Sequence, residues 1–147
     1  AFQLGAHFSG KAINISKTTI SHAISYPLTS HFGIPHGIAV FLTLPGIAEL
    51  NYHIAGPTMQ PGLDPEQHRE NFLTLFKLFE VTDIAGLTGK LRSISNKLNI
   101  KTRLREYGLT RQDLPVIAEN SFTKGRSDNN PGIIDKDAIL KLLGGIF

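Results

Sequence analysis

Apolar residues recur along this chain with the period of about 3.6 residues that marks one face of an α-helix, and this spacing constrains the fold more than any other feature. The clearest case begins at Asp64 and Pro65, which read as an N-cap and a first helical residue, with Gln67 placed to complete a capping box. Apolar residues follow at helical spacing at Phe72, Leu75, Phe76 and Phe79. The segment is predicted to be a half-buried helix.

Similar patterns predict helices over most of the remaining chain. Residues 1–13 are rich in small side chains and are expected to form a helix that packs closely against a neighbour. A second helix is expected from Thr19 or Ser21 to about Phe32, and a third from Pro35 to Ile47. Three further helices are expected to bury these apolar sets: Leu87, Leu91, Ile94 and Leu98; Leu114, Ile117 and Ala118; and Ile139, Leu140, Leu142 and Leu143.

Cap and turn residues mark where these helices begin and end. The run 110–113 resembles a capped start, Asp135 opens the last helix, and the pair Gly144-Gly145 is expected to end it. Residues 51–63 and 122–134 contain many turn formers and are expected to be irregular. No segment shows the strict alternation of a strand, and no internal repeat is present. We predict one all-α, multi-helical domain.

Composition limits the chemistry that this domain can carry. With 147 residues, of which 41% are hydrophobic and 18% charged, the chain can bury a core, and disorder is not expected. The absence of cysteine excludes disulfides, zinc ribbons and thiol nucleophiles. Any metal must therefore be bound by His, Asp or Glu. A soluble, cytoplasmic protein is the default expectation.

Charge and hydropathy point to no membrane or nucleic-acid partner. The formal net charge is only +3, and the basic residues of the run 90–105 alternate with apolar residues without interleaved aromatic side chains. The longest apolar stretch, 38–50, is too short and too interrupted to span a bilayer. The chain begins at Ala1 without an initiator methionine or a signal peptide, so it is expected to start inside a longer protein.

Three of the six histidines, His22, His31 and His36, lie within fifteen residues of one another. The separation of His22 from His36 suits two helices joined by a short turn at 32–35, and imidazoles on neighbouring helices can converge on iron, zinc or nickel. By spacing alone, a structural role for His22 as a cap or a core hydrogen-bonding residue is favoured. His31 fits a helix end, where its charge would complement the terminal carbonyls.

The segment around these histidines resembles the signature of the iron-containing (group III) alcohol dehydrogenases. That signature is roughly a small-residue helix, a His-Ala pair, a Pro-His-Gly motif and an apolar helix that ends in Leu-Pro. The matching elements here are Ser21-His22-Ala23, Tyr26-Pro27-Leu28, Ile34-Pro35-His36-Gly37, Leu44-Pro45 and Asn51, followed by similar elements at 103–109 and 129–131. The resemblance covers the whole chain.

The resemblance implies a fold and a metal site. Family members join an N-terminal Rossmann-like domain to a C-terminal helical domain of the dehydroquinate synthase-like fold. Their metal is bound in the cleft by one Asp and three His, of which the last two match His22 and His36. The other two ligands and the pyrophosphate loop match nothing here. Residues 1–147 are therefore expected to be the helical metal-binding domain of a longer enzyme, with Fe²⁺ or Zn²⁺ as the metal and NAD(P)H bound by the absent domain.

Two departures from the family pattern concern the substrate. Many members carry a second histidine where this chain has Tyr26; tyrosine can donate a hydrogen bond to a reacting oxygen, but its pKa of about 10 makes it a poor proton shuttle. Packing against the cleft wall is an equal alternative. The stretch before His22 resembles the phosphonoacetaldehyde reductase branch and offers donors for an anion, against the alternative of solvated surface charges. The candidate substrate-binding residues are Lys11, Asn14, Lys17, Thr18 and Thr19.

The expected function is that of an NAD(P)H-dependent, metal-assisted reductase of a small anionic aldehyde such as phosphonoacetaldehyde, in a homodimer. A nearby alternative keeps the enzyme and changes the substrate to a simple alcohol or another acid-bearing aldehyde. The more distant alternative is an isolated helical domain that packs against a partner without catalysis. Arg126, with Asn129 and Asn130, either helps to bind an anion or forms a turn with local hydrogen bonds.

Overall fold

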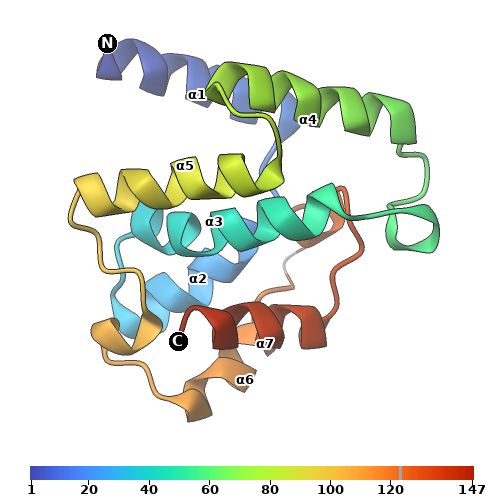
Figure 1. Ribbon diagram of the computed structural model, residues 1–147. Coiled ribbons are helices and arrows are strands. Elements are labelled where there is room, and N and C mark those ends of the chain that lie inside the picture. Colours follow the sequence, from blue (N-terminus) through green and yellow to red (C-terminus); the bar gives the residue numbers. More distant parts are fainter. Residues whose placement is uncertain (123) are drawn as a thin grey trace.

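The computed structural model describes residues 1–122 and 124–147, and these residues form an all-helical domain (Figure 1). The predicted fold class is confirmed, because the described residues contain no strand beyond one isolated antiparallel bridge between Met59 and Gly132. The α-helices are α1 (Phe2–Ser16), α2 (Ile20–Phe32), α3 (His36–Tyr52), α4 (Pro65–Phe79), α5 (Ile84–Lys97), α6 (Leu114–Glu119) and α7 (Lys136–Gly145). Short 3₁₀ helices are η1 (Gly56–Thr58), η2 (Leu104–Tyr107), η3 (Arg111–Asp113) and η4 (Ser127–Asn129).

Helices α2 and α3 pack against each other over their length and are joined by a short turn at Gly33. Gly33 adopts a left-handed conformation with φ of 64°, which glycine enters without the steric cost of a Cβ atom. The main core lies around α2, whose Ile20, Ile24 and Leu28 are buried together with residues of α3, α6 and α7. This packing fixes where the side chains at the start of α2 and of α3 meet.

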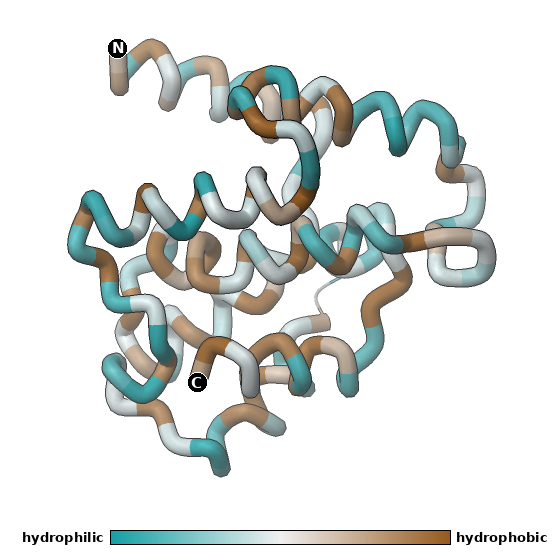
Figure 2. The backbone as a smooth tube through the Cα atoms, viewed as in Figure 1, coloured by the Kyte–Doolittle hydropathy of each residue, from teal (hydrophilic) through white to brown (hydrophobic). Residues whose placement is uncertain are grey.

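A smaller core joins α4 and α5 to the end of α3. Phe72 and Phe76 of α4 pack with Leu87 of α5. The ring of Tyr52, at the end of α3, lies 5.2 Å from that of Phe72 and 5.7 Å from that of Phe76, centroid to centroid. Figure 2 shows the hydrophilic first half of α4 and the more hydrophobic segments in the centre of the bundle. No helix of the described chain is long and apolar enough to cross a membrane.

Several predicted caps are confirmed. The carboxylate of Asp64 accepts a hydrogen bond from the Glu66 amide, and that of Asp135 accepts one from the Ala138 amide. The capping box expected from Gln67 is wrong, because its side chain donates instead to Asn71 one turn further along α4. This i, i+4 contact competes with the reach back to the N-cap.

Other corrections concern helix ends and faces. Helix α3 begins at His36 rather than Pro35 and continues beyond Ile47 to Tyr52, and α7 includes both of the glycines expected to end it. Ile94 of α5 and Leu98, which follows the end of that helix, are exposed although their spacing predicted burial. The buried face of α5 is formed instead by Leu87, Leu91 and the polar Thr88 and Ser95. Leu75 of α4 is also exposed.

Helix α1 forms as predicted but buries none of its residues within the described chain. Phe2 is 97% exposed and Ile15 is 85% exposed. The close packing expected from its small residues is therefore absent among the described residues, since no neighbouring helix covers them.

The late loop, residues 124–134, is tied to the rest of the domain by asparagine side chains. Asn130 and Asn51 exchange two amide hydrogen bonds of 2.8 and 3.0 Å in a buried pair. Asn129 donates to the carbonyls of Ser16 and Thr18, at the junction of α1 and α2. The predicted irregular segment 122–134 contains η4, and its residue Thr123 lies outside the described residues.

Candidate metal centre

The imidazole rings of His22 and His36 converge at one end of the α2–α3 pair. Their centroids lie 5.4 Å apart, with an angle of 62° between the ring planes. His22 lies in the first turn of α2, and His36 is the first residue of α3. His22 is half-buried and His36 exposed, so the pair faces solvent at the surface of the domain.

Ser25 connects the two histidines and fixes the tautomer of one of them. The Ser25 hydroxyl donates to the carbonyl oxygen of His22 at 2.7 Å, and its oxygen lies 3.2 Å from Nδ1 of His36. Because the single hydroxyl proton goes to the carbonyl, the serine oxygen accepts a hydrogen bond from Nδ1–H of His36. That tautomer leaves the Nε2 lone pair of His36 available to a metal.

Burial and nearby positive groups disfavour the charged form of the second imidazole, that of His22. Burial lowers the pKa of His22 below its ordinary value, and the nearby His36 and the positive charge of Arg126 lower it further. Neutral imidazole is the form that coordinates a metal ion. The local environment of His22 therefore favours metal binding over protonation.

Tyr26 and Arg126 complete the surroundings of the pair. The Tyr26 ring lies 5.9 Å from that of His36, centroid to centroid, and its side chain is partly exposed. The guanidinium carbon of Arg126, from the late loop, lies 4.8 Å from the centre of the Tyr26 ring. The predicted catalytic Tyr26 is thus adjacent to the predicted metal ligands. The sequence alone did not decide between an anion-binding role and a turn role for Arg126, because nothing in its local spacing connects it to α2.

The predicted substrate-binding residues are divided between two places. Lys11, Asn14 and Lys17 line a shallow depression on the surface of α1. Thr18 and Thr19 are half-buried at the start of α2, close in sequence to His22. Across residues 1–122 and 124–147, no hydrogen bond or ring contact joins any of these five side chains to the histidine pair.

The remaining histidines lie apart from the pair. His31 is exposed near the end of α2, beside Phe32, and His7 and His53 are also exposed. His68 is buried, and its Nε2 lies 2.8 Å from the carbonyl oxygen of Asn51. The position of His31 in the last turn of α2 matches the helix end expected for it.

His22 and His36 are the residues that could hold part of a metal site. Two neutral imidazole nitrogens suit iron or zinc. Within the described ranges, no third His, Asp or Glu joins them to form a group of three or more. The donor set therefore fits two of the four ligands that the resemblance implies, and the role of the pair as metal ligands stays a prediction.

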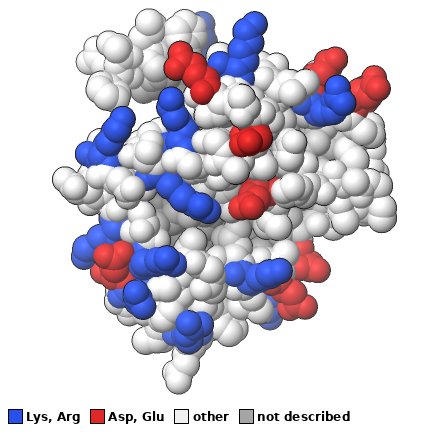
Figure 3. Space-filling view, in the orientation of Figure 1, with Lys and Arg blue, Asp and Glu red and all other residues white. Residues whose placement is uncertain are grey.

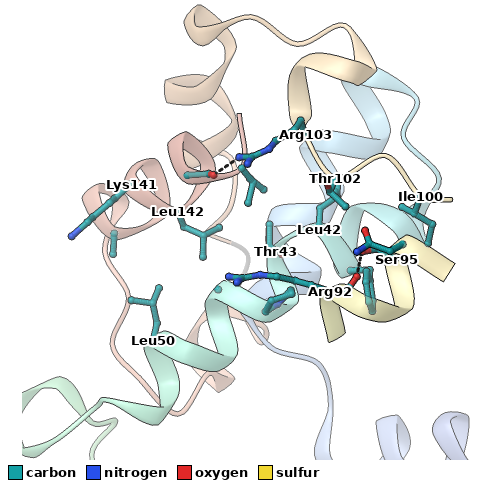
Figure 4. A pocket seen from close by; sticks show the side chains of 17 residues that line it. Leu42, Thr43, Leu50, Arg92, Ser95, Ile100, Thr102, Arg103, Lys141 and Leu142 are labelled. Carbon is teal, nitrogen blue, oxygen red and sulfur yellow. Dashed lines mark hydrogen bonds between the residues drawn. The ribbon is translucent and has the colours of Figure 1, made fainter. Parts of the chain in front are cut away.

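A cavity of about 790 Å³ lies elsewhere, between α3, α5 and α7 (Figure 4). Apolar residues such as Leu42 and Leu142 line it, together with the basic side chains of Arg92, Arg103 and Lys141. None of the predicted site residues lines this cavity. Figure 3 shows that basic and acidic side chains both occur over the face it displays, without one large patch of a single sign.

Comparisons with known proteins identify the family of the chain. The model of the Fe-containing alcohol dehydrogenase family, C-terminal, matches residues 1–147. The chain is 28% identical to the sulfoacetaldehyde reductase of Bilophila wadsworthia, covering 100% of this chain and 38% of that protein. It is 29% identical to the phosphonoacetaldehyde reductase of Streptomyces viridochromogenes, covering 98% of this chain and 35% of that protein.

A solved structure extends the comparison to three dimensions. The sulfoacetaldehyde reductase from Bifidobacterium kashiwanohense, solved in complex with NAD⁺, superposes with a TM-score of 0.66 at 25% sequence identity. The match covers 88% of this chain and 31% of that one. The chain thus spans about a third of the length of the relatives that it matches. It belongs to the iron-containing alcohol dehydrogenase family, as a helical C-terminal domain of that fold.

Proposed function

We propose that this chain is the metal-binding helical domain of an NAD(P)H-dependent reductase that converts a small anionic aldehyde, such as phosphonoacetaldehyde, to its alcohol. The observation that carries the proposal is the convergence of His22 and His36, with ring centroids 5.4 Å apart, in a chain of this family. We place the enzyme in the cytoplasm as a homodimer.

The anionic substrate class is supported by relatives and by nearby charge. Two relatives are named for aldehydes that carry a sulfonate or a phosphonate group. Lys17, Thr18 and Thr19 lie at the junction of α1 and α2, shortly before His22, and the late loop binds this junction through Asn129. We propose these residues, together with Lys11 and Asn14 on the preceding turns of α1, as donors for the anion.

The residues of this chain have distinct roles in the proposed reaction. His22 and His36 would hold Fe²⁺ or Zn²⁺ through neutral nitrogens, with Ser25 orienting His36. When bound, the metal supplies a Lewis acid for a carbonyl oxygen, and NAD(P)H, held by another domain, supplies the hydride. The hydroxyl of Tyr26, beside His36, donates a hydrogen bond to the reacting oxygen.

One observation favours a second candidate function, a non-catalytic domain that packs against a partner. Helix α1 exposes Phe2, Phe8 and Ile15, and such apolar side chains are normally covered by another surface. Cover by the rest of a longer enzyme satisfies the same requirement, and it also explains the paired histidines, which simple packing does not.

The proposal is tested with the full-length protein that contains this chain. After loading with Fe²⁺ or Zn²⁺, oxidation of NADH and NADPH is followed with phosphonoacetaldehyde, sulfoacetaldehyde and the neutral propanal. We expect turnover of the anionic aldehydes that a chelator abolishes and added metal restores. Absence of NAD(P)H oxidation with every aldehyde and both metals would contradict the proposal.

A further inference from the structure

The late loop that carries Arg126 is held in place at two points. Asn130 is buried and is bonded to Asn51 and to the carbonyl of Gly132. Asn129 donates to the carbonyls of Ser16 and Thr18 at 3.0 and 3.1 Å. Helix η4, which ends at Asn129, packs against α2, the helix that carries His22. Arg126 therefore precedes a segment whose position relative to the metal ligands is fixed.

Arg126 reaches the histidine pair through Tyr26. Its guanidinium carbon lies 4.8 Å from the centre of the Tyr26 ring, and that ring lies 5.9 Å from the ring of His36. The arginine is half-buried, whereas the lysines proposed from the sequence are exposed on α1. Arg126 is thus the cation that contacts the candidate reaction site directly, in the part of the chain that the structure describes.

The guanidinium of Arg126 has N–H donors that are available to a ligand. The ion pair among the described residues joins Lys136 to Glu119 and does not involve Arg126. No described side chain accepts a hydrogen bond from the Arg126 guanidinium, whose contact is with the Tyr26 ring. Its planar group presents several N–H donors in a fork that matches two oxygens of one tetrahedral or planar anion. Contact with the Tyr26 ring restricts the orientation of this fork.

We propose that Arg126 is the specificity-determining residue that binds the anionic group of the substrate through its guanidinium. This inference rests on the proposed function. In a two-carbon aldehyde the sulfonate or phosphonate is two bonds from the carbonyl carbon, so the anion and the reacting carbonyl must be bound side by side. The adjacent positions of Arg126, Tyr26 and His36 provide such an arrangement.

The test compares anionic with neutral aldehydes in the metal-loaded, full-length enzyme. Arg126→Gln removes the charge and the fork, and we expect KM for phosphonoacetaldehyde and sulfoacetaldehyde to rise about 10- to 100-fold. KM for propanal and all kcat values should stay within about threefold of wild type, because propanal makes no charged contact. Arg126→Lys, which retains the charge, should recover part of the loss. The control is Arg105→Gln, on the exposed η2, which should leave every parameter unchanged.

A binding measurement separates this inference from the proposed function. Ethanesulfonate and ethylphosphonate, which cannot be reduced, are titrated calorimetrically into wild-type and Arg126→Gln protein. The inference is supported if the variant binds these anions more weakly by the factor expected for KM. This conclusion holds even if wild type reduces no aldehyde, because that result would contradict only the proposed reaction. The inference is overturned if both proteins bind the anions equally, if neither binds them, or if the variant loses anionic and neutral aldehydes alike. The last result would show that Arg126 only supports Tyr26.

Discussion

His22 and His36 place their imidazole rings 5.4 Å apart although thirteen residues separate them in the sequence. The turn at Gly33 and the packing of α3 on α2 bring the two residues together. Ser25, one turn beyond His22 on the same helix, bonds to both residues. The pair is therefore held by the helical framework rather than by local spacing such as i, i+4.

Ser25→Ala should weaken metal binding without removing a ligand. The hydroxyl is the acceptor for Nδ1–H of His36, and its loss frees the ring to rotate and to change tautomer. We expect the metal affinity of the full-length protein to fall about 10-fold or more, measured by competition with a chromogenic chelator. Ser30→Ala, at an exposed position of α2, is the matched control. Equal affinity in the two variants would show that Ser25 does not orient the ligand.

The buried amide pair makes the late loop a stabilising element. Asn130→Ala leaves the amide of Asn51 and the carbonyl of Gly132 without their partner, and buried unsatisfied groups of this kind cost about 1–3 kcal/mol each. We expect the free energy of unfolding to fall by at least about 1 kcal/mol, measured by urea denaturation. Asn71→Ala, on the exposed face of α4, should change it by less than about 0.5 kcal/mol. Similar values for both variants would contradict this role of the pair.

Substitution by alanine should change the stability of the protein in opposite directions at two glycines. A Cβ atom at Gly132 would lie 2.7 Å from Cγ2 of Ile54 and 3.1 Å from Oδ1 of Asn51, so overpacking should cost about 1–3 kcal/mol. A Cβ atom at Gly89, within α5, meets no atom within 4 Å, and removal of glycine from a helix should add about 0.5–1 kcal/mol of stability. Thermal unfolding of the two variants tests this, and a stabilising Gly132→Ala would refute the packing argument.

Asp113 provides a prediction about pH. Hydrogen bonds from the side chain and the backbone amide of Thr110 lower the pKa of Asp113 below its ordinary value of 3.8. Because the folded-state pKa is depressed, the carboxylate stabilises the start of η3 above the unfolded-state pKa, and the contribution is lost as pH falls through the folded-state pKa. In a carboxyl NMR titration, Thr110→Val should raise the pKa of Asp113. A pKa unchanged by this substitution would contradict the assignment to the side-chain bond.

Local sequence signals predicted where the helices begin better than they predicted which side of each helix is buried. Asp64 and Asp135 fix helix starts through short-range hydrogen bonds, which sequence spacing reveals directly. Exposure of Ile94 and Leu98 could not be predicted in this way, because it depends on which neighbours cover α5. The same holds for α1, whose apolar side chains have no cover among the described residues.

The residues of the candidate site that belong to sequence motifs could be predicted. The residue that reaches the site through long-range contacts could not. The positions of His22, Tyr26 and His36 follow from the resemblance and from two helices with one turn. Arg126 approaches Tyr26 from a hundred residues further along the chain, and only the anchoring of the late loop brings it there. No local pattern could distinguish this arginine from one in an ordinary surface turn.

The central claim is that His22 and His36 bind one metal ion together. It is tested most directly by elemental analysis of the full-length protein after anaerobic loading with Fe²⁺ or Zn²⁺, in wild type, His22→Ala, His36→Ala and the exposed control His31→Ala. We predict about one metal ion per chain in wild type and in the His31 control, with loss of the metal in each of the other two variants. Full retention of the metal by either His22→Ala or His36→Ala would contradict the account.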